Sequence, residues 1–200
     1  MKQVFVAVLI FLASQGFSQR FSSEVFHEGF LVTVAKDTLK GNLKYDLEAN
    51  ILTIVGSGKT ISFSSHKVFY FEIFDKILNN YRQFYSIPYT VNFDYKIPVF
   101  FEVVYEGKLS LLRREQIVMR SVNTTSAYWG GGNVRQTVLE YSYFFLDSKG
   151  SITFFNGKKK DLIRFMSKKQ NEVKEFIKEN RLETDRSSDL VRITAFYNSI

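Results

Sequence analysis

Residues Thr38–Tyr45, TLKGNLKY, give the clearest indication of the fold class of this 200-residue chain. Leu39, Gly41, Leu43 and Tyr45 alternate there with polar residues. A period of two is that of a β-strand with one face buried and one face in water. The stretch therefore predicts a strand whose odd-numbered side chains point into a core.

The same period continues outward from this strand, between Phe26 and Phe155. Turn-forming sequences interrupt it at residues 36–37, 56–59, 106–107 and 147–150. Short strands, frequent turns and only two prolines favour antiparallel pairing. We expect residues 20–157 to form an antiparallel β-sandwich or partial barrel of about 8–10 strands.

After Gly157 the apolar residues recur at helical spacing, so residues 158–200 are expected to form two or three helices packed on the β domain. The alternative is that a helix face binds a partner. Ser167, with Gln170 three residues later, resembles a capping box that opens a helix, and Asn180 is a reasonable left-handed stop. The expected fold class is α+β.

The N-terminus has the pattern of a secretory signal peptide. Lys2 precedes ten apolar residues, Val4–Ala13, and a polar stretch with small residues follows up to Gln19. As a helix, ten residues span about 15 Å, well short of a hydrocarbon core of about 30 Å. We expect residues 1–19 to be removed, although a buried strand or a retained anchor would also be apolar. The mature chain is then expected in the periplasm, at the outer membrane or outside the cell, without a transmembrane segment.

The amino-acid composition excludes several kinds of catalytic and metal-binding site. The chain has no cysteine, which excludes disulfides, thiol nucleophiles and Cys-based metal sites. His27 and His66 are the only histidines, so no metal site and no cofactor are predicted. The string Gly56–Thr60, GSGKT, ends like a phosphate-binding loop, but Thr53 stands where that motif needs glycine. A hairpin turn is expected there.

Two carboxylates lie within aromatic strands, where a charge must be paired or held neutral. These are Glu102 and Glu140, and Arg113 or Arg114 on the next predicted strand could pair with one of them. Glycan hydrolysis requires two convergent carboxylates, so Glu102, Glu140 or Asp94 in one cleft would indicate that alternative. We expect each to form a structural ion pair or to face outward, and we expect no catalytic residue.

Residues 121–136 are polar and glycine-rich and contain the only tryptophan of the chain. Tyr128 and Trp129 offer flat apolar surface with polar tips, which suits stacking on a sugar or contact with a protein. They are the candidate ligand-binding residues. The plainer interpretation is a long hairpin connection whose aromatic rings lie back on the sheet.

The chain carries 27 Lys and Arg against 20 Asp and Glu. Its densest basic cluster is Lys158–Lys160 with Arg164, Lys168 and Lys169. An exported protein seldom meets nucleic acid, so an anionic glycan, lipopolysaccharide or acidic leaflet is the expected kind of target. The alternative is a solvated helix face that confers solubility.

Three further stretches of the sequence are distinctive: DTLKGNLKYD early in the chain, FFEVVYEGKLSLLRRE in the middle, and EVKEFIKENRL with a terminal YNS near the end. Together they resemble a family of small secreted cell-envelope proteins from Bacteroidetes. The resemblance implies an exported envelope protein and a β-rich fold with C-terminal helices. It implies no reaction and no catalytic residues.

These observations predict an exported, non-enzymatic cell-envelope module that binds a protein or glycan partner. The alternative is a carboxylate-dependent glycan hydrolase.

Overall fold

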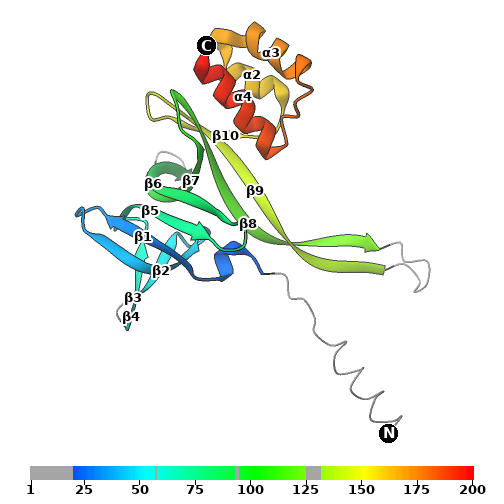
Figure 1. The fold of residues 1–200 in the computed structure, drawn as a ribbon. Coiled ribbons are helices and arrows are strands. Elements are labelled where there is room, and N and C mark those ends of the chain that lie inside the picture. Colours follow the sequence, from blue (N-terminus) through cyan, green and yellow to red (C-terminus); the bar gives the residue numbers. More distant parts are fainter. Residues whose placement is uncertain (1–19, 57, 93–94, 125–131) are drawn as a thin grey trace, which may run out of the picture.

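The computed structural model describes residues 20–56, 58–92, 95–124 and 132–200. Within these ranges ten strands form one antiparallel sheet in the order β10-β9-β8-β7-β6-β5-β1-β2-β3-β4 (Figure 1). The strands are β1 His27–Thr33, β2 Thr38–Asp46, β3 Ile51–Gly56, β4 Lys59–Ser64, β5 Val68–Asp75, β6 Asn80–Asn92, β7 Tyr95–Tyr105, β8 Leu109–Thr124, β9 Gly132–Asp147 and β10 Ile152–Phe155. The predicted α+β class with an antiparallel sheet and C-terminal helices is confirmed.

Helices begin and end the described part of the chain. A short 3-10 turn, η1 Ser22–Glu24, precedes the sheet, and the C-terminal elements are α2 Lys159–Phe165, η2 Ser167–Lys169, α3 Gln170–Glu179 and α4 Ser187–Ser199. The three α-helices lie together at one end of the molecule (Figure 1). None of the helices within the described ranges is both long and apolar enough to cross a bilayer.

The predicted helix boundaries are partly wrong. Ser167 lies in η2, and Lys169 is the N-cap of α3 without a side-chain capping hydrogen bond, so the capping box does not form. Asn180 ends α3 with φ of −90°, and the left-handed residue is Arg181, with φ of 51°. The intervening 3-10 turn displaces the start of the helix. At the other end, the Leu182 amide donates to the Ile177 carbonyl and closes the last turn one residue later than expected.

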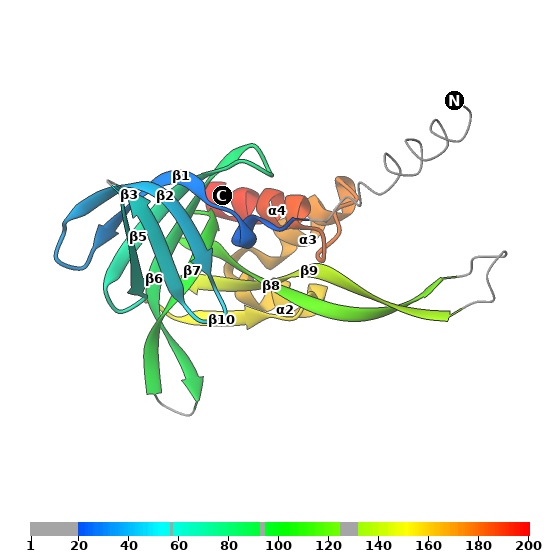
Figure 2. The same ribbon diagram turned by 90° about the horizontal axis from the view of Figure 1, so that it is seen from below.

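Two parts of the sheet go beyond the sequence prediction. Strand β6 was not predicted, and its Pro88 lies directly opposite Pro98 of β7. Residues 121–136, expected as a loop, are partly strand, because β8 and β9 stay paired up to Thr124 and Gly132. The outer part of this hairpin, residues 114–124 and 132–142, is called the arm below. Figure 2 shows it extending away from the body.

The sheet coils, and apolar side chains fill three separate clusters. One lies among the strands from β1 to β7 around Leu31, Leu43 and Phe71. A second joins Leu111 and Phe145 of the sheet to the helices, and a third lies around Phe101 and Phe144. Because neighbouring residues of a strand point to opposite faces, Phe100 and Phe101 enter different clusters.

Candidate functional site

An arginine surrounded by acids lies between the first two apolar clusters. All five N–H donors of Arg82 in β6 are used. They reach Glu102 at 2.9 and 2.7 Å, Asp75 at 2.9 Å, Glu115 at 2.8 Å and the Tyr45 hydroxyl at 2.7 Å. These residues come from five different strands and are all buried. Together with Arg113 they form what we call the ion cluster.

Glu102 is the centre of the ion cluster. Both of its oxygens accept hydrogen bonds from Arg82, and both also accept from Arg113, at 2.8 and 2.7 Å. Burial alone would raise the pKa of Glu102, but the hydrogen bonds and charges of the two guanidinium groups lower it below its ordinary value. Glu102 is therefore held as an anion.

The pKa values of two further members of the ion cluster, Asp75 and Tyr45, are also shifted. Burial would raise the pKa of Asp75, yet hydrogen bonds from the Ser22 side chain, the Ile77 and Leu78 amides and Arg82 lower it. Burial raises the pKa of Tyr45 far above its ordinary value. The Tyr45 hydroxyl therefore stays protonated and donates a hydrogen bond to Glu115 at 2.5 Å.

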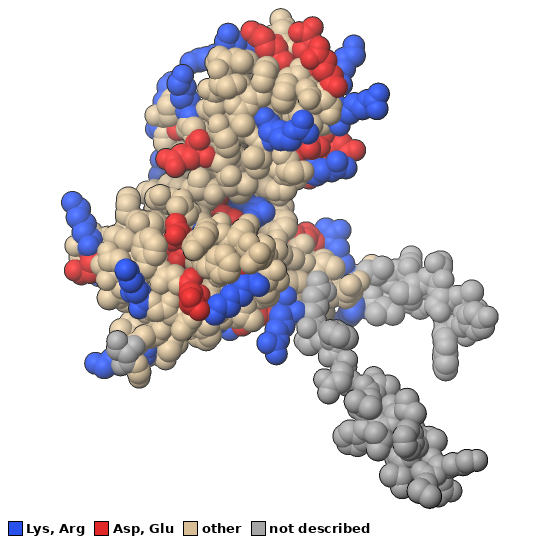
Figure 3. Space-filling model, viewed as in Figure 1, with Lys and Arg blue, Asp and Glu red and all other residues tan. Residues whose placement is uncertain are grey.

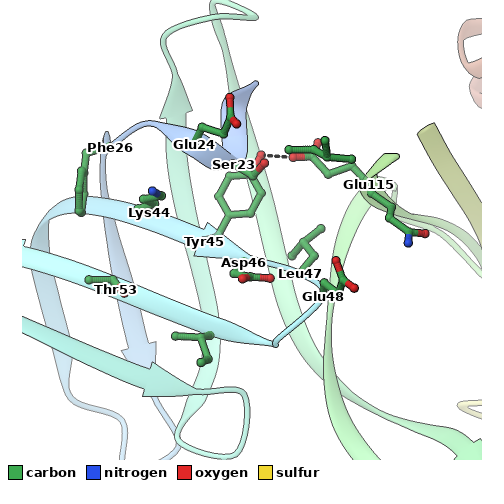
Figure 4. A pocket seen from close by; sticks show the side chains of 13 residues that line it. Ser23, Glu24, Phe26, Lys44, Tyr45, Asp46, Leu47, Glu48, Thr53 and Glu115 are labelled. Carbon is green, nitrogen blue, oxygen red and sulfur yellow. Dashed lines mark hydrogen bonds between the residues drawn. The ribbon is translucent and has the colours of Figure 1, made fainter. Parts of the chain in front are cut away.

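A hollow of about 570 Å³ opens beside the ion cluster, between η1, the β2–β3 hairpin and β8. We call it the acidic hollow, because four carboxylates and one lysine line it: Glu24, Asp46, Glu48, Glu115 and Lys44. Figure 4 shows these side chains together with Phe26 and Tyr45, and the bond from Tyr45 to Glu115. Three of the four carboxylates already accept hydrogen bonds: Glu24 from the Phe21 amide, Asp46 from the Ala49 amide, and Glu115 from Arg82 and the Tyr45 hydroxyl.

A second hollow, of about 890 Å³, lies between α2 and α3. We call it the basic hollow, because five cationic side chains and one carboxylate line it: Lys159, Lys160, Arg164, Lys174, Lys178 and Asp161. Lys and Arg side chains stand out from this helical end of the molecule in Figure 3. The basic cluster predicted from the sequence is therefore divided between two hollows. Lys168 and Lys169 line a different one, together with Lys108 and Lys149.

The structural ion pair expected for a strand carboxylate forms between Glu102 and Arg113. Arg114 points elsewhere and donates to the carbonyl oxygens of Phe100 and Leu47. Glu140 pairs with Arg120 on the arm, where both side chains are partly exposed. Glu102 and Glu140 lie on opposite faces of the sheet, because Arg113 faces Glu102 and Gln116, three residues on, faces Glu140.

The remaining candidate residues either have a structural role or lie outside the residues that the structure describes. Asp94, Tyr128 and Trp129 lie outside the described residues. His27 is buried, with Nε2 against the Ser22 carbonyl oxygen at 2.7 Å, and its Nδ1 accepts from the Lys76 amide. No group of three or more His, Asp or Glu side chains in the described part of the chain is placed to hold a metal ion.

The string Gly56–Thr60 continues from β3 into β4, and Gly56 is paired with Lys59. No helix follows whose amides could face a phosphate, so the predicted hairpin interpretation holds.

Sequence reasoning missed Arg82, Asp75 and Glu115, which are half of the ion cluster. They lie on three different strands, and nothing in the sequence around any one of them marks the other two as its neighbours. It also missed Lys174 and Lys178. Their spacing with Gln170, at i, i+4 and i+8, places all three on one helix face and was a usable signal.

Comparison of the chain with protein-family models, with curated proteins and with solved structures finds no match. The resemblance to secreted Bacteroidetes proteins therefore stays a prediction.

Proposed function

We propose that this protein is an exported, non-enzymatic cell-envelope module that binds a partner protein through the arm. Export is supported by the signal-like residues 1–19, which lie outside the described residues. A non-enzymatic role is supported by Glu102, which is clamped as an anion between two guanidinium groups and has no free oxygen for proton transfer.

The strand pairing of the arm carries the proposal. Toward the tip of the arm, the pairing of β7 with β8 ends at Glu102 and Arg113. The pairing of β9 with β10 ends at Tyr143 and Phe155. Beyond Arg113 and Tyr143, the pairings of the described strands join β8 and β9 only to each other. A two-stranded ribbon is marginally stable alone, and its unpaired backbone edges are templates for another strand.

The side chains of the arm also favour binding of a partner protein there. On one face Met119 is 75% exposed and Ile117 is 36% exposed, and Leu139 lies opposite Ile117. On the other face Val118 lies opposite Val138. Apolar side chains on a projecting ribbon are typical of interaction surfaces. The occupant we infer is an extended segment of a partner protein, which adds as a strand to the edge of β8 and covers Ile117 and Met119.

Site-specific photo-crosslinking in the native cell envelope tests this function. A photoreactive residue at Ile117 is expected to give one discrete protein adduct. The added substitution Met119→Lys is expected to abolish that adduct, because an edge lysine opposes strand addition. The matched control is the same probe at Tyr81, which is 72% exposed on β6, a strand that pairs with β5 and β7.

Absence of an adduct at Ile117 would contradict the proposed function. So would an adduct that survives Met119→Lys or that forms equally at Tyr81.

The acidic hollow favours a second candidate function, carboxylate-dependent glycan hydrolysis. It brings Glu115 into one hollow with Glu24, Asp46 and Glu48, and two carboxylates are the minimum that this reaction requires. Turnover of envelope glycans that is lost in both Asp46→Asn and Glu48→Gln would support hydrolysis. Turnover unaffected by either change would exclude the acidic hollow as its site.

A further inference from the structure

The basic hollow holds more positive charge than its own side chains neutralise. Its one carboxylate, Asp161, lies 3.5 Å from Arg164. The ion pairs of the described residues include none of the four lysines that line the hollow: Lys159, Lys160, Lys174 and Lys178. Like charges gathered around one space repel each other, and a bound anion relieves that repulsion.

The two helices present these charges to the same space. Lys160 and Arg164 are four residues apart on α2, as are Lys174 and Lys178 on α3, so each pair shares a helix face. Ile163, buried between them, lines the hollow too. The aliphatic stems of the lysines add apolar surface beneath their charged ends. The hollow is thus apolar at its base and cationic at its rim.

This combination indicates the class of ligand. Lysine ammonium groups act as compact point charges with three donors, which suits the tetrahedral oxygens of phosphate. An apolar base suits the carbon face of a sugar ring. The volume, about 890 Å³, is within the range of roughly 300–1,000 Å³ for small-molecule sites.

We propose that the basic hollow binds a phosphorylated saccharide through its phosphate groups. The saccharide is either a soluble sugar phosphate or the headgroup of a phosphorylated glycolipid. This site is separate from the arm and does not depend on it.

Binding is measured with two probes and the purified protein. Glucose bisphosphate, followed by titration calorimetry, represents the soluble source. Phosphatidylcholine vesicles with and without lipid A, followed by sedimentation, represent the lipid source. The test variant is Lys174→Glu with Lys178→Glu. The matched control is Lys36→Glu with Lys59→Glu, which makes the same charge change at two exposed lysines in the β1–β2 and β3–β4 hairpins.

The wild-type protein and the control are expected to bind at least one probe. The test variant is expected to bind about tenfold or more weakly, since two charge-assisted hydrogen bonds are replaced by repulsion. Binding of glucose bisphosphate identifies a soluble source, and binding of lipid A vesicles alone identifies a headgroup. Thermal melts check that both variants are folded.

Failure of the wild-type protein to bind either probe would overturn the proposal. An equal loss in test and control variants would also overturn it, because binding would then reflect the overall charge. Either result leaves the crosslinking at Ile117 unaffected.

Discussion

Arg82 and Glu102 form a two-point ion pair across neighbouring strands, Nε to Oε1 at 2.9 Å and Nη2 to Oε2 at 2.7 Å. Both side chains are almost fully buried. Such a pair contributes to stability only when every remaining hydrogen-bonding group is satisfied. Within the described residues that condition is met, since no buried side-chain nitrogen or oxygen is without a partner. The pair lies where the core of β1–β7 meets the core beneath the helices.

Removing the positive charge at the centre of the ion cluster should be strongly destabilising. Arg82→Met leaves Asp75, Glu102 and Glu115 buried with only Arg113 to compensate them. We expect the free energy of unfolding to fall by about 3–5 kcal/mol, as for other broken buried pairs. Urea denaturation measures this change.

The control for that prediction is Arg120→Met, which removes a guanidinium from a partly exposed pair with Glu140. Its urea midpoint should match that of the wild-type protein. Similar losses in the two variants would mean that the ion cluster has no special role.

Acid should destabilise the fold through Glu102. Its pKa is lower in the folded chain than its ordinary value, so the unfolded chain takes up a proton first as pH falls. The stabilisation is therefore complete above the ordinary glutamate pKa of about 4.3 and is lost as pH falls toward the lower folded value. Urea midpoints measured from neutral pH down to about pH 3 should decline, and most steeply below about pH 4.5.

Glu102→Gln supplies the comparison for the acid response. It should be less stable at neutral pH but lose less further stability on acidification, because this carboxylate no longer titrates. Parallel curves for the two proteins would place the acid sensitivity elsewhere.

The alternation in β2 predicts opposite outcomes for adjacent residues. Leu43 is 0% exposed in the β1–β7 core, whereas Lys44 lies on the other face. Leu43→Asp should cost more than about 4 kcal/mol and unfold the protein, because it buries an unpaired charge. Lys44→Thr should leave the melting temperature within a few degrees of wild type. Equal thermal melts for the two variants would mean that the strand face is assigned wrongly.

Gly29 should tolerate no side chain. It lies opposite Gly41 in β2 and Ile73 in β5, and a Cβ at this position would collide with the Glu72 carbonyl oxygen. That oxygen belongs to the sheet backbone, so relief would require separation of β1 from β5. Gly29→Ala should therefore destabilise by about 2 kcal/mol or more in urea denaturation.

Gly58→Ala is a useful contrast to that substitution. Gly58 has φ of 75° in an exposed turn with open space around it, so its cost should be limited to backbone strain of about 1 kcal/mol. A larger loss for Gly58→Ala than for Gly29→Ala would contradict the close approach of β1 and β5.

Local sequence pattern was sufficient to predict most of the fold. The alternation around Leu43, the turn at 56–59 and the change to helical spacing after Gly157 each depend on residues a few positions apart. It failed where distant contacts decide. Strand β6 contains Pro88, which argues against a strand locally but is accommodated opposite Pro98. Residues 121–136, the outer end of the arm, were expected as a loop because this stretch is polar and glycine-rich, and on a projecting ribbon little needs burial.

For the candidate sites too, some features could be predicted from the sequence and others could not. Residue type and short spacing were enough to predict that Glu102 needs a cationic partner, that the helical end is basic, and that strands precede helices. The contacts of Arg82 could be found only in the folded chain, because its partners Asp75, Glu102, Glu115 and Tyr45 are 7, 20, 33 and 37 residues from it in the sequence. Those contacts arise from the coiling of the whole sheet, which is set by the packing of many apolar side chains at once.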